Sequence, residues 1–217
     1  IDEALAGHCD EISVSIHEDE SLTVVDNGRG IPVGPIKHEN PKFNGRPAVE
    51  IVLAVPNAGG KFDNNSYKTS GGLHGVGVSC VNALSEWLEA EVARGGKMHA
   101  IGFDRGVVTR ELEVIGDADS TGTKISWRAD RQIFGEMTHD FDMIVGRLKE
   151  RAYLNPGITI HVEDDRTKKK ETFRFDEGLS QMVRDINDGK TTYHDPVYIR
   201  TVTEDESTTC EVALQYV

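Results

Sequence analysis

The sequence predicts an α+β protein: a two-layer sandwich with helices on one face of a mixed, mostly antiparallel sheet, followed by the start of a second α/β domain. Runs of alternating apolar and polar residues, typical of half-buried strands, recur along the 217 residues. A few segments with helical apolar spacing lie between them, and helices on one side of a sheet can bury both patterns. We expect the first domain at residues 1–170 and the second at 171–217.

The first predicted elements are a helix end, a hairpin and a short helix. IDEALAGHCD (1–10) resembles the last turns of a helix, with Gly7 where a left-handed C-terminal cap belongs. The runs 11–18 and 21–26 alternate and are joined by an acidic turn, which predicts an antiparallel pair. Residues 46–55 have proline in a first helical turn and then apolar residues at helical spacing.

Strands dominate the rest of the chain, and four consecutive strand-like runs predict a meander. A polar segment after them reads as a hairpin tip or hinge, beyond which the second domain begins. The predicted elements are a helix from about Val76 to Leu84, strands at 87–94, 97–104, 107–115 and 121–129, a helix at 139–154, a strand at 157–164, the hairpin tip or hinge at 164–171, a helix at 177–188 and strands after Tyr198.

Composition and charge exclude several classes of protein. With 37 acidic and 24 basic residues, the net charge of −13 opposes direct binding to a phosphate backbone, so any nucleic-acid role must be carried elsewhere. We find no membrane span and no signal peptide, and we expect a cytoplasmic protein without membrane contact. Cys9, Cys80 and Cys210 are too scattered for a zinc or disulfide pattern, and we expect reduced, buried thiols.

Glycine clusters indicate where the chemistry lies. Ten of the 22 glycines fall between Gly28 and Gly77, where something approaches the backbone closely or the backbone must move. The run TSGGLHGVGVSCVNALS leads from glycines into a helix, whose first N–H groups are unsatisfied and therefore form an anion cradle that fits phosphate. A P-loop and a dinucleotide fingerprint both fail on spacing.

The segments DNGRG and TGT predict the other half of a site. Asp26 ends a strand, where a carboxylate can accept a hydrogen bond from an exocyclic amine, and Gly28 and Gly30 let a flat ring approach the backbone. Thr123 adds a hydroxyl. Together with the 71–77 loop, these residues predict an adenine pocket that opens onto a phosphate cradle.

Simpler interpretations stay open for several of these residues. Asp26 could be a turn former at a strand end and Arg29 an ordinary surface charge. His74 could be a metal ligand, but no partner lies at ligand spacing, which favours a loop histidine. TKKK (167–170) could suggest DNA contact, although a solvated hairpin is favoured.

At these residues the sequence resembles the ATPase domains shared by DNA gyrase B, topoisomerase IV, mismatch-repair proteins, heat-shock chaperones and sensor histidine kinases. The resemblance extends over essentially the whole chain, and IDEALAG, DNGRGIPV, AGGKFDNNSYKTSGGLHGVGVSCVNALS and TGT are similar to the gyrase B branch. It implies an ATP-hydrolysing type II DNA topoisomerase (an isomerase) that supercoils DNA, with ATP and Mg2+ as cofactors. The second domain would be the start of a transducer domain.

The resemblance also implies roles for single residues. Asp26 would bind the adenine amino group with Thr123 assisting through a water, and Arg29 would pair with Glu3 at the pocket mouth. Lys61, Tyr67 and Lys68 would belong to a lid over the triphosphate. The implied cofactor-binding set is Asp26, Gly28, Arg29, Gly30, Ile31, Pro32, Val52, Lys61, Tyr67, Lys68, Gly72, Leu73, His74, Gly75, Val76, Gly77, Val78 and Thr123, and the implied aminocoumarin inhibitor set is Glu3, Asp26, Arg29, Pro32, Arg94 and Thr123.

One part of the family pattern is missing. The opening helix of the family carries a general-base Glu and a magnesium-binding Asn before the Asp that Asp2 matches. Both would precede Ile1, so no catalytic or metal-binding residue is assigned, and we expect this chain to be a hydrolysis-incompetent fragment. A lysine-bearing loop of the second domain, which touches the terminal phosphate in the family, would lie beyond Val217.

The resemblance implies partners and leaves alternatives. ATP binding would drive homodimerisation of the domain, gyrase A would join the complex, and DNA would be bound through the full-length complex rather than through this fragment. The alternatives are the ATPase component of topoisomerase IV, a histidine kinase of the same fold and a non-catalytic nucleotide sensor. A kinase predicts no second domain after the nucleotide fold, and the missing Glu and Asn favour a sensor.

Overall fold

A computed structural model describes residues 7–57, 76–203 and 208–217. The strands are β1 (Glu11–Ile16), β2 (Leu22–Asp26), β3 (Ser85–Arg94), β4 (Lys97–Asp104), β5 (Val107–Asp117), β6 (Gly122–Ala129), β7 (Thr159–Asp164), β8 (Lys169–Arg174), β9 (Val197–Val202) and β10 (Thr209–Leu214). The helices are α2 (Ala48–Ala54), α3 (Gly77–Ala83), α4 (Arg131–Phe134), α5 (Phe141–Tyr153) and α6 (Leu179–Ile186).

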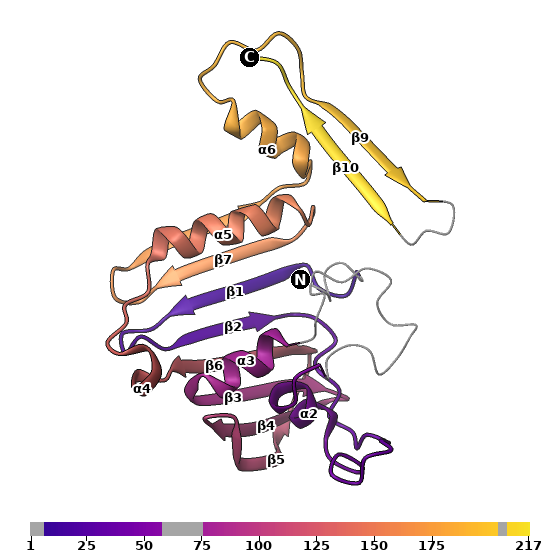
Figure 1. Ribbon diagram of the computed structural model, residues 1–217, viewed down its shortest axis with the longest axis vertical. Coiled ribbons are helices and arrows are strands. Elements are labelled where there is room, and N and C mark those ends of the chain that lie inside the picture. The colour runs from indigo at the N-terminus through magenta and orange to yellow at the C-terminus, as the bar shows by residue number, and fades with distance from the viewer. Residues whose placement is uncertain (1–6, 58–75, 204–207) are drawn as a thin grey trace.

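Eight strands form the main sheet, in the order β5-β4-β3-β6-β2-β1-β7-β8. Figure 1 shows α2, α3 and α5 in front of this sheet, with α6 and the β9–β10 pair extending beyond α5. A mixed sheet with few helices and a small second sheet is the predicted α+β class. Among the described helices, none is long and apolar enough to cross a membrane.

The predicted hairpin at the start of the chain is confirmed. β1 and β2 pair antiparallel. On its other side β1 pairs with β7, and this is the one parallel pairing among the described strands of the main sheet. β7 and β8 form a second hairpin, so the segment 164–171 contains a hairpin tip. Because β8 belongs to the main sheet, that sheet extends to Arg174; the domain division at residue 170 stays a prediction.

The predicted meander is wrong for its last strand. β3, β4 and β5 follow one another, but β6 pairs with β3 and β2 rather than with β5. The chain after β5 crosses the β3–β4 turn, where the Ala118 N–H donates to the Gly96 carbonyl at 3.1 Å. β6 therefore lies in the centre of the sheet, where its first residues adjoin the end of β2.

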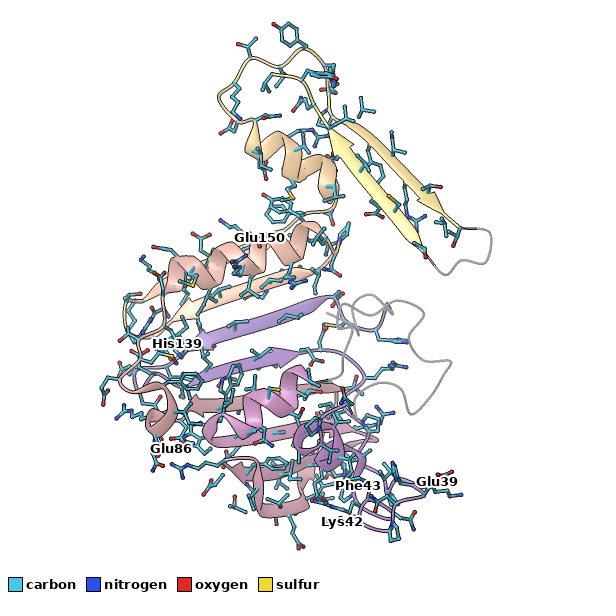
Figure 2. All side chains as sticks on the ribbon, viewed as in Figure 1. Glu39, Lys42, Phe43, Glu86, His139 and Glu150 are labelled. Atoms are coloured by element: carbon cyan, nitrogen blue, oxygen red, sulfur yellow. The ribbon has the colours of Figure 1, made fainter. Side chains whose placement is uncertain are left out.

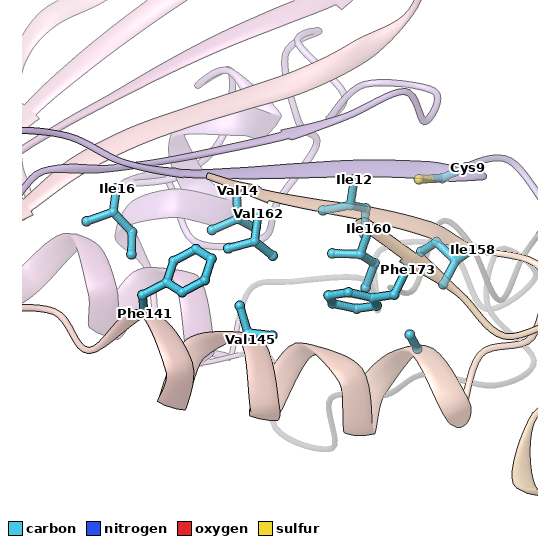
Figure 3. Close-up of a cluster of buried hydrophobic side chains, with 11 residues drawn as sticks. Cys9, Ile12, Val14, Ile16, Phe141, Val145, Ile158, Ile160, Val162 and Phe173 are labelled. Atoms are coloured by element: carbon cyan, nitrogen blue, oxygen red, sulfur yellow. The ribbon is translucent and has the colours of Figure 1, made fainter. Parts of the chain in front are cut away.

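Two hydrophobic clusters lie between the sheet and its helices. The α5 cluster joins β1, β7 and α5, and Figure 3 shows Phe141 and Val145 facing Ile12, Val14 and Val162 of the strands. This confirms the apolar stripe predicted for 139–154. The α2–α3 cluster is a separate core over β3 and β4. Its buried members are Val49, Leu53, Leu88, Ala90, Val92, Ile101 and Phe103, and Val78, Val81 and Ile31 are half-buried against them.

The opposite face of the main sheet is polar. Strand residues alternate between faces, and the residues between the core positions pair with one another: Lys124 with Glu91 at 2.8 Å, and Ser15 with Glu163 at 3.1 Å. We call it the uncovered face, because no described helix packs on it (Figure 1).

The three cysteines differ in burial. All are free, but only Cys9 is buried, while Cys80 and Cys210 are exposed on α3 and β10. The prediction of buried thiols is wrong for these two, because Cys80 lies on the outer side of its helix and Cys210 on a strand of an exposed pair. Burial raises the pKa of the Cys9 thiol.

Gly7 and the loop at residues 36–46 lie outside the helices and strands. Gly7 has a φ of 75°, the left-handed conformation predicted for a helix cap, while residues 1–6 lie outside the described part of the chain. Residues 36–46 form a loop closed at its base by hydrogen bonds between Ile36 and Arg46 and between Gly45 and Ile36, each 2.9 Å. Figure 2 shows Glu39, Lys42 and Phe43 near its tip, away from the sheet.

Candidate nucleotide site

The strand order brings Asp26 and Thr123 side by side. Asp26 is paired in register with Ile12 on one side and with Thr123 on the other, and Thr123 is paired with Val92. Residues directly opposite in neighbouring strands point to the same face. Because Ile12 and Val92 belong to the two hydrophobic clusters, the Asp26 carboxylate and the Thr123 hydroxyl lie on the helix-covered face, between those clusters.

Hydrogen bonds to Asp26 and Thr123 hold the loop that follows β2. The Gly28 N–H donates to Asp26 Oδ1 at 2.8 Å, which is a turn typical of an aspartate at a strand end. The Ile31 N–H donates to Thr123 Oγ1 at 3.3 Å. Asp26 is half-buried and Thr123 is buried, so both polar groups are held at fixed positions near the surface.

Gly30 is required by packing. Its φ is 72°, and a Cβ there would lie 2.7 Å from the Ala93 carbonyl oxygen and 3.0 Å from that of Gly122. Arg94 holds the same loop, because its Nη1 donates to the carbonyls of Arg29, at 3.1 Å, and of Gly30. Close contact with β3 and β6 is thus one reason for the glycine, and the flat-ring role of Gly30 stays a prediction.

Two residues that sequence reasoning missed shape this end of the sheet. A Cβ at Gly122 would lie 2.3 Å from the Asp26 carbonyl oxygen, so only glycine allows β6 to start beside Asp26. Asn27 Oδ1 accepts the N–H groups of Asp10 and Glu11, each at 3.1 Å, and so fixes the entry to β1. They lie in the segments DNG and TGT, where a glycine next to polar residues was a usable signal.

Four further described site residues lie on or next to the helices that cover this face of the sheet. Val52 is half-buried on α2, Val76 is the residue before α3, Gly77 is its first residue, and Val78 packs with Ile31 against the α2–α3 cluster. Arg29 is half-buried and Pro32 exposed. Eight predicted site residues lie outside the described ranges: Glu3, Lys61, Tyr67, Lys68, Gly72, Leu73, His74 and Gly75.

A cavity of about 320 Å³ lies at the same end of the sheet. Asp26 and Thr123 border it, but Ser13, Val25 and Lys124 of the uncovered face also line it. Because those three side chains alternate with the core positions, the cavity opens mainly on the face opposite to the Asp26 carboxylate.

The lysines of the TKKK segment have acidic partners. Lys169 Nζ lies 3.4 Å from Asp142, and Lys170 Nζ lies 2.9 Å from Glu163. These are exposed pairs on a hairpin tip, which supports the solvated-hairpin interpretation. Among the described residues, no group of three or more His, Cys, Asp or Glu side chains could hold a metal ion.

A family model described as histidine kinase-, DNA gyrase B- and HSP90-like ATPase matches residues 1–133, which is more than half of the chain. The chain belongs to this ATPase family. The match includes β1, β2, α2, α3, β3 to β6 and all the described site residues. The polar pair at Asp26 and Thr123 therefore lies within the part of the chain that matches the family.

Individual members of this ATPase family match the whole chain. It is 50% identical to the DNA gyrase B protein of Halalkalibacterium halodurans, over all of this chain and 33% of that protein, and 47% identical to the DNA gyrase B protein of Thermotoga maritima, over all of this chain and 34% of that protein. The predicted resemblance to gyrase B is thus confirmed. The chain spans about a third of the length of these curated relatives.

A solved structure shows the same fold. The crystal structure of the 43K ATPase domain of Thermus thermophilus gyrase B, in complex with an aminocoumarin, aligns with a TM-score of 0.78 and 40% identity. The alignment covers 93% of this chain and 50% of that one.

Proposed function

We propose that this chain is the ATP-binding domain of a DNA gyrase B protein, with the start of a transducer domain in residues 171–217. In the full protein it would couple ATP binding and hydrolysis to dimerisation, DNA strand passage and negative supercoiling, together with gyrase A in the cytoplasm. Support comes from the identity to gyrase B relatives over the whole chain. The observation that carries the proposal is the Asp26–Thr123 pair on the helix-covered face.

The described residues fit an adenine group. The Asp26 carboxylate would accept the exocyclic amine, and the Thr123 hydroxyl would complete the polar edge. Ile31, Val52 and Val78 would supply apolar walls. ATP itself supplies the phosphoanhydride bond, and the described residues would bind and orient its base.

The remaining assignments extend this proposal. Residues 72–78 would hold the phosphates, Lys61, Tyr67 and Lys68 would cover them, and no described residue is assigned to Mg2+. An aminocoumarin would contact the same end of the sheet, where Arg94 donates to the loop carbonyls of Arg29 and Gly30.

The C-terminal elements would transmit nucleotide binding to the rest of the protein. α6 contacts α5 through a hydrogen bond of 2.5 Å from the Tyr153 hydroxyl to Asp185, and the Tyr153 ring stacks on Phe175 at 3.7 Å. An element that packs on both the sheet layer and the second domain is suited to carry such coupling.

Calorimetric titration of Asp26→Asn with a non-hydrolysable ATP analogue tests the proposal. Loss of a charged hydrogen bond should weaken binding by roughly 1.5–3 kcal/mol. Asp19→Asn is the matched control, because Asp19 Oδ1 also accepts a backbone N–H, from Ser21 at 3.0 Å, at the other end of β2. Unchanged affinity in Asp26→Asn would remove the adenine assignment.

A further inference from the structure

Asn82 links the two helices that carry predicted site residues. It lies on α3 with its side chain fully buried, and its Nδ2 donates to the Leu53 carbonyl at 3.0 Å. Leu53 is in the last turn of α2, where carbonyls have no partner within the helix. The Asn82 amide therefore acts as a side-chain cap for α2 while being part of α3.

The same amide carries an unpartnered atom. Within the described part of the chain, Asn82 Oδ1 is the buried side-chain oxygen without a hydrogen-bond partner. A buried acceptor without a partner lowers the free energy of unfolding. The inward neighbours on the two helices, Val49, Leu53, Val78 and Val81, are apolar. A leucine at position 82 would remove this unpartnered acceptor but would leave the Leu53 carbonyl without its donor, so the two residues differ less in stability than in the link between the helices.

The position of Asn82 suggests what the amide does. Val52 lies one residue before the carbonyl that Asn82 binds, and Val76 to Val78 begin the helix that carries Asn82. Asn82 lies in the last turn of α3, where Ser85 Oγ donates to the Val81 carbonyl at 2.6 Å and Ala83 packs against Gly106. Its hydrogen bond to Leu53 thus joins the end of α2, next to Val52, to the helix that begins with Val76–Val78.

We propose that Asn82 is a positioning residue for nucleotide binding: its hydrogen bond to Leu53 sets the placement of α3 relative to α2, and so of Val76–Val78 relative to Val52. This role rests on the proposed function. The amide is retained for the geometry that its donor imposes, at the expense of an acceptor left without a partner. A helix shifted by a fraction of an ångström would misplace groups that must contact one ligand.

Three variants test this role in the chain expressed with the flanking sequence that its gene encodes. Asn82→Leu removes the link but fills the site, and Asn82→Ala removes the link and leaves a cavity. Ser85→Ala is the matched control, because it removes a hydrogen bond to the same turn of α3 that does not involve α2. Melting temperature and the Kd for a non-hydrolysable ATP analogue are measured for each.

We expect Asn82→Leu to melt close to the wild-type temperature, because it exchanges one unpartnered acceptor, Asn82 Oδ1, for another, the Leu53 carbonyl. It should nevertheless bind the analogue about tenfold more weakly. Asn82→Ala should melt lower with a similar loss of affinity, and Ser85→Ala should melt lower with wild-type affinity. Wild-type affinity in Asn82→Leu would overturn the positioning role, as would affinity losses that follow melting temperature in all three variants. A wild-type chain that does not bind the analogue would instead contradict the proposed function, and this role with it.

Discussion

The two ends of the main sheet use carboxylates differently. At the Asp164 end, where β1 and β7 finish, Asp164 is 1% exposed and is bound by Arg166 through Nε and Nη2, both at 2.9 Å. Arg166 also reaches Glu20 at 2.6 Å and the carbonyl of His139 at 2.7 Å. Figure 2 labels His139 at this end. One guanidinium therefore joins three turns that are far apart in sequence.

A second buried carboxylate near the Asp164 end follows the same rule. Asp130, directly after β6, accepts Arg105 Nε at 2.6 Å and the Gln132 N–H at 2.9 Å. At the Asp26 end, by contrast, the carboxylate of Asp26 accepts the N–H of Gly28, and glycines shape the surrounding backbone. A buried carboxylate that is paired with an arginine, as Asp164 and Asp130 are, has a structural role. A half-buried carboxylate at a strand end, surrounded by glycine turns, is suited to binding a ligand.

Removing the Arg166 guanidinium should have the largest effect on stability. Arg166→Met leaves Asp164 buried without its guanidinium, and breaking such a pair costs about 3–5 kcal/mol in the free energy of unfolding. Urea denaturation measures the loss. Affinity for an ATP analogue, measured where the variant is folded, should be unchanged because the Asp26 end is intact. A loss below about 1 kcal/mol would show that the two ends do not differ in this way.

Gly30→Ala should lower the free energy of unfolding by about 2–3 kcal/mol. The new Cβ would overlap the Ala93 carbonyl oxygen, and residue 30 has a left-handed backbone conformation. Unlike Arg166→Met, it should also weaken nucleotide binding. Gly34→Ala is the control, since a Cβ there meets nothing within 4 Å. Equal effects of the two alanines would contradict the packing role of Gly30.

Acid should weaken the Asp164 end selectively. Hydrogen bonding by Arg166 holds the pKa of Asp164 well below its usual range, so this carboxylate stabilises the fold above its unfolded pKa of 3.8. That contribution is lost as the pH falls below that value, by about 2 kcal/mol near pH 2. Urea midpoints from pH 6 to pH 2 test this. The fall should be smaller in Arg166→Met; an identical fall would assign the acid sensitivity to other groups.

Lys168→Ala should have the smallest effect. Lys168 lies 3.9 Å from Glu18 on the same hairpin tip as Arg166, but both side chains are more than 70% exposed. Solvent-screened pairs contribute less than about 0.5 kcal/mol. Thermal melting at low and high salt checks this. A large, salt-dependent loss would mean that charge at the Asp164 end matters independently of burial.

Local pattern was enough to predict most elements. Alternation located the strands from β1 to β7, apolar spacing located α2 and α5, and the glycine run that leads into a helix located α3. Pairing across long separations was not predictable in the same way. Four strands in succession favour a meander, yet β6 returns to β3, because the neighbours of a strand depend on tertiary packing that no local repeat encodes.

In the candidate site, too, short motifs predicted some residues, and tertiary contacts determined the importance of others. Asp26, Gly30 and Thr123 were predicted from short motifs, and the structure brings them together through the β2–β6 register. Gly122, Asn27 and Asn82 were not assigned roles. Gly122 matters because a Cβ there would lie 2.3 Å from the Asp26 carbonyl oxygen, Asn27 because it accepts two backbone N–H groups, and Asn82 because it caps another helix. Each of these contacts depends on a partner that is distant in sequence or in another element.

The parallel pairing of β1 with β7 has a consequence for the folding of the chain during its synthesis. Ser15 and Glu163, which meet across this ladder, are 148 positions apart. At roughly 5–20 residues per second, a ribosome would need about 7–30 s to release the second strand after the first. During that interval one edge of the nascent hairpin stays open to other chains, so newly made molecules should be most prone to aggregate before β7 has emerged.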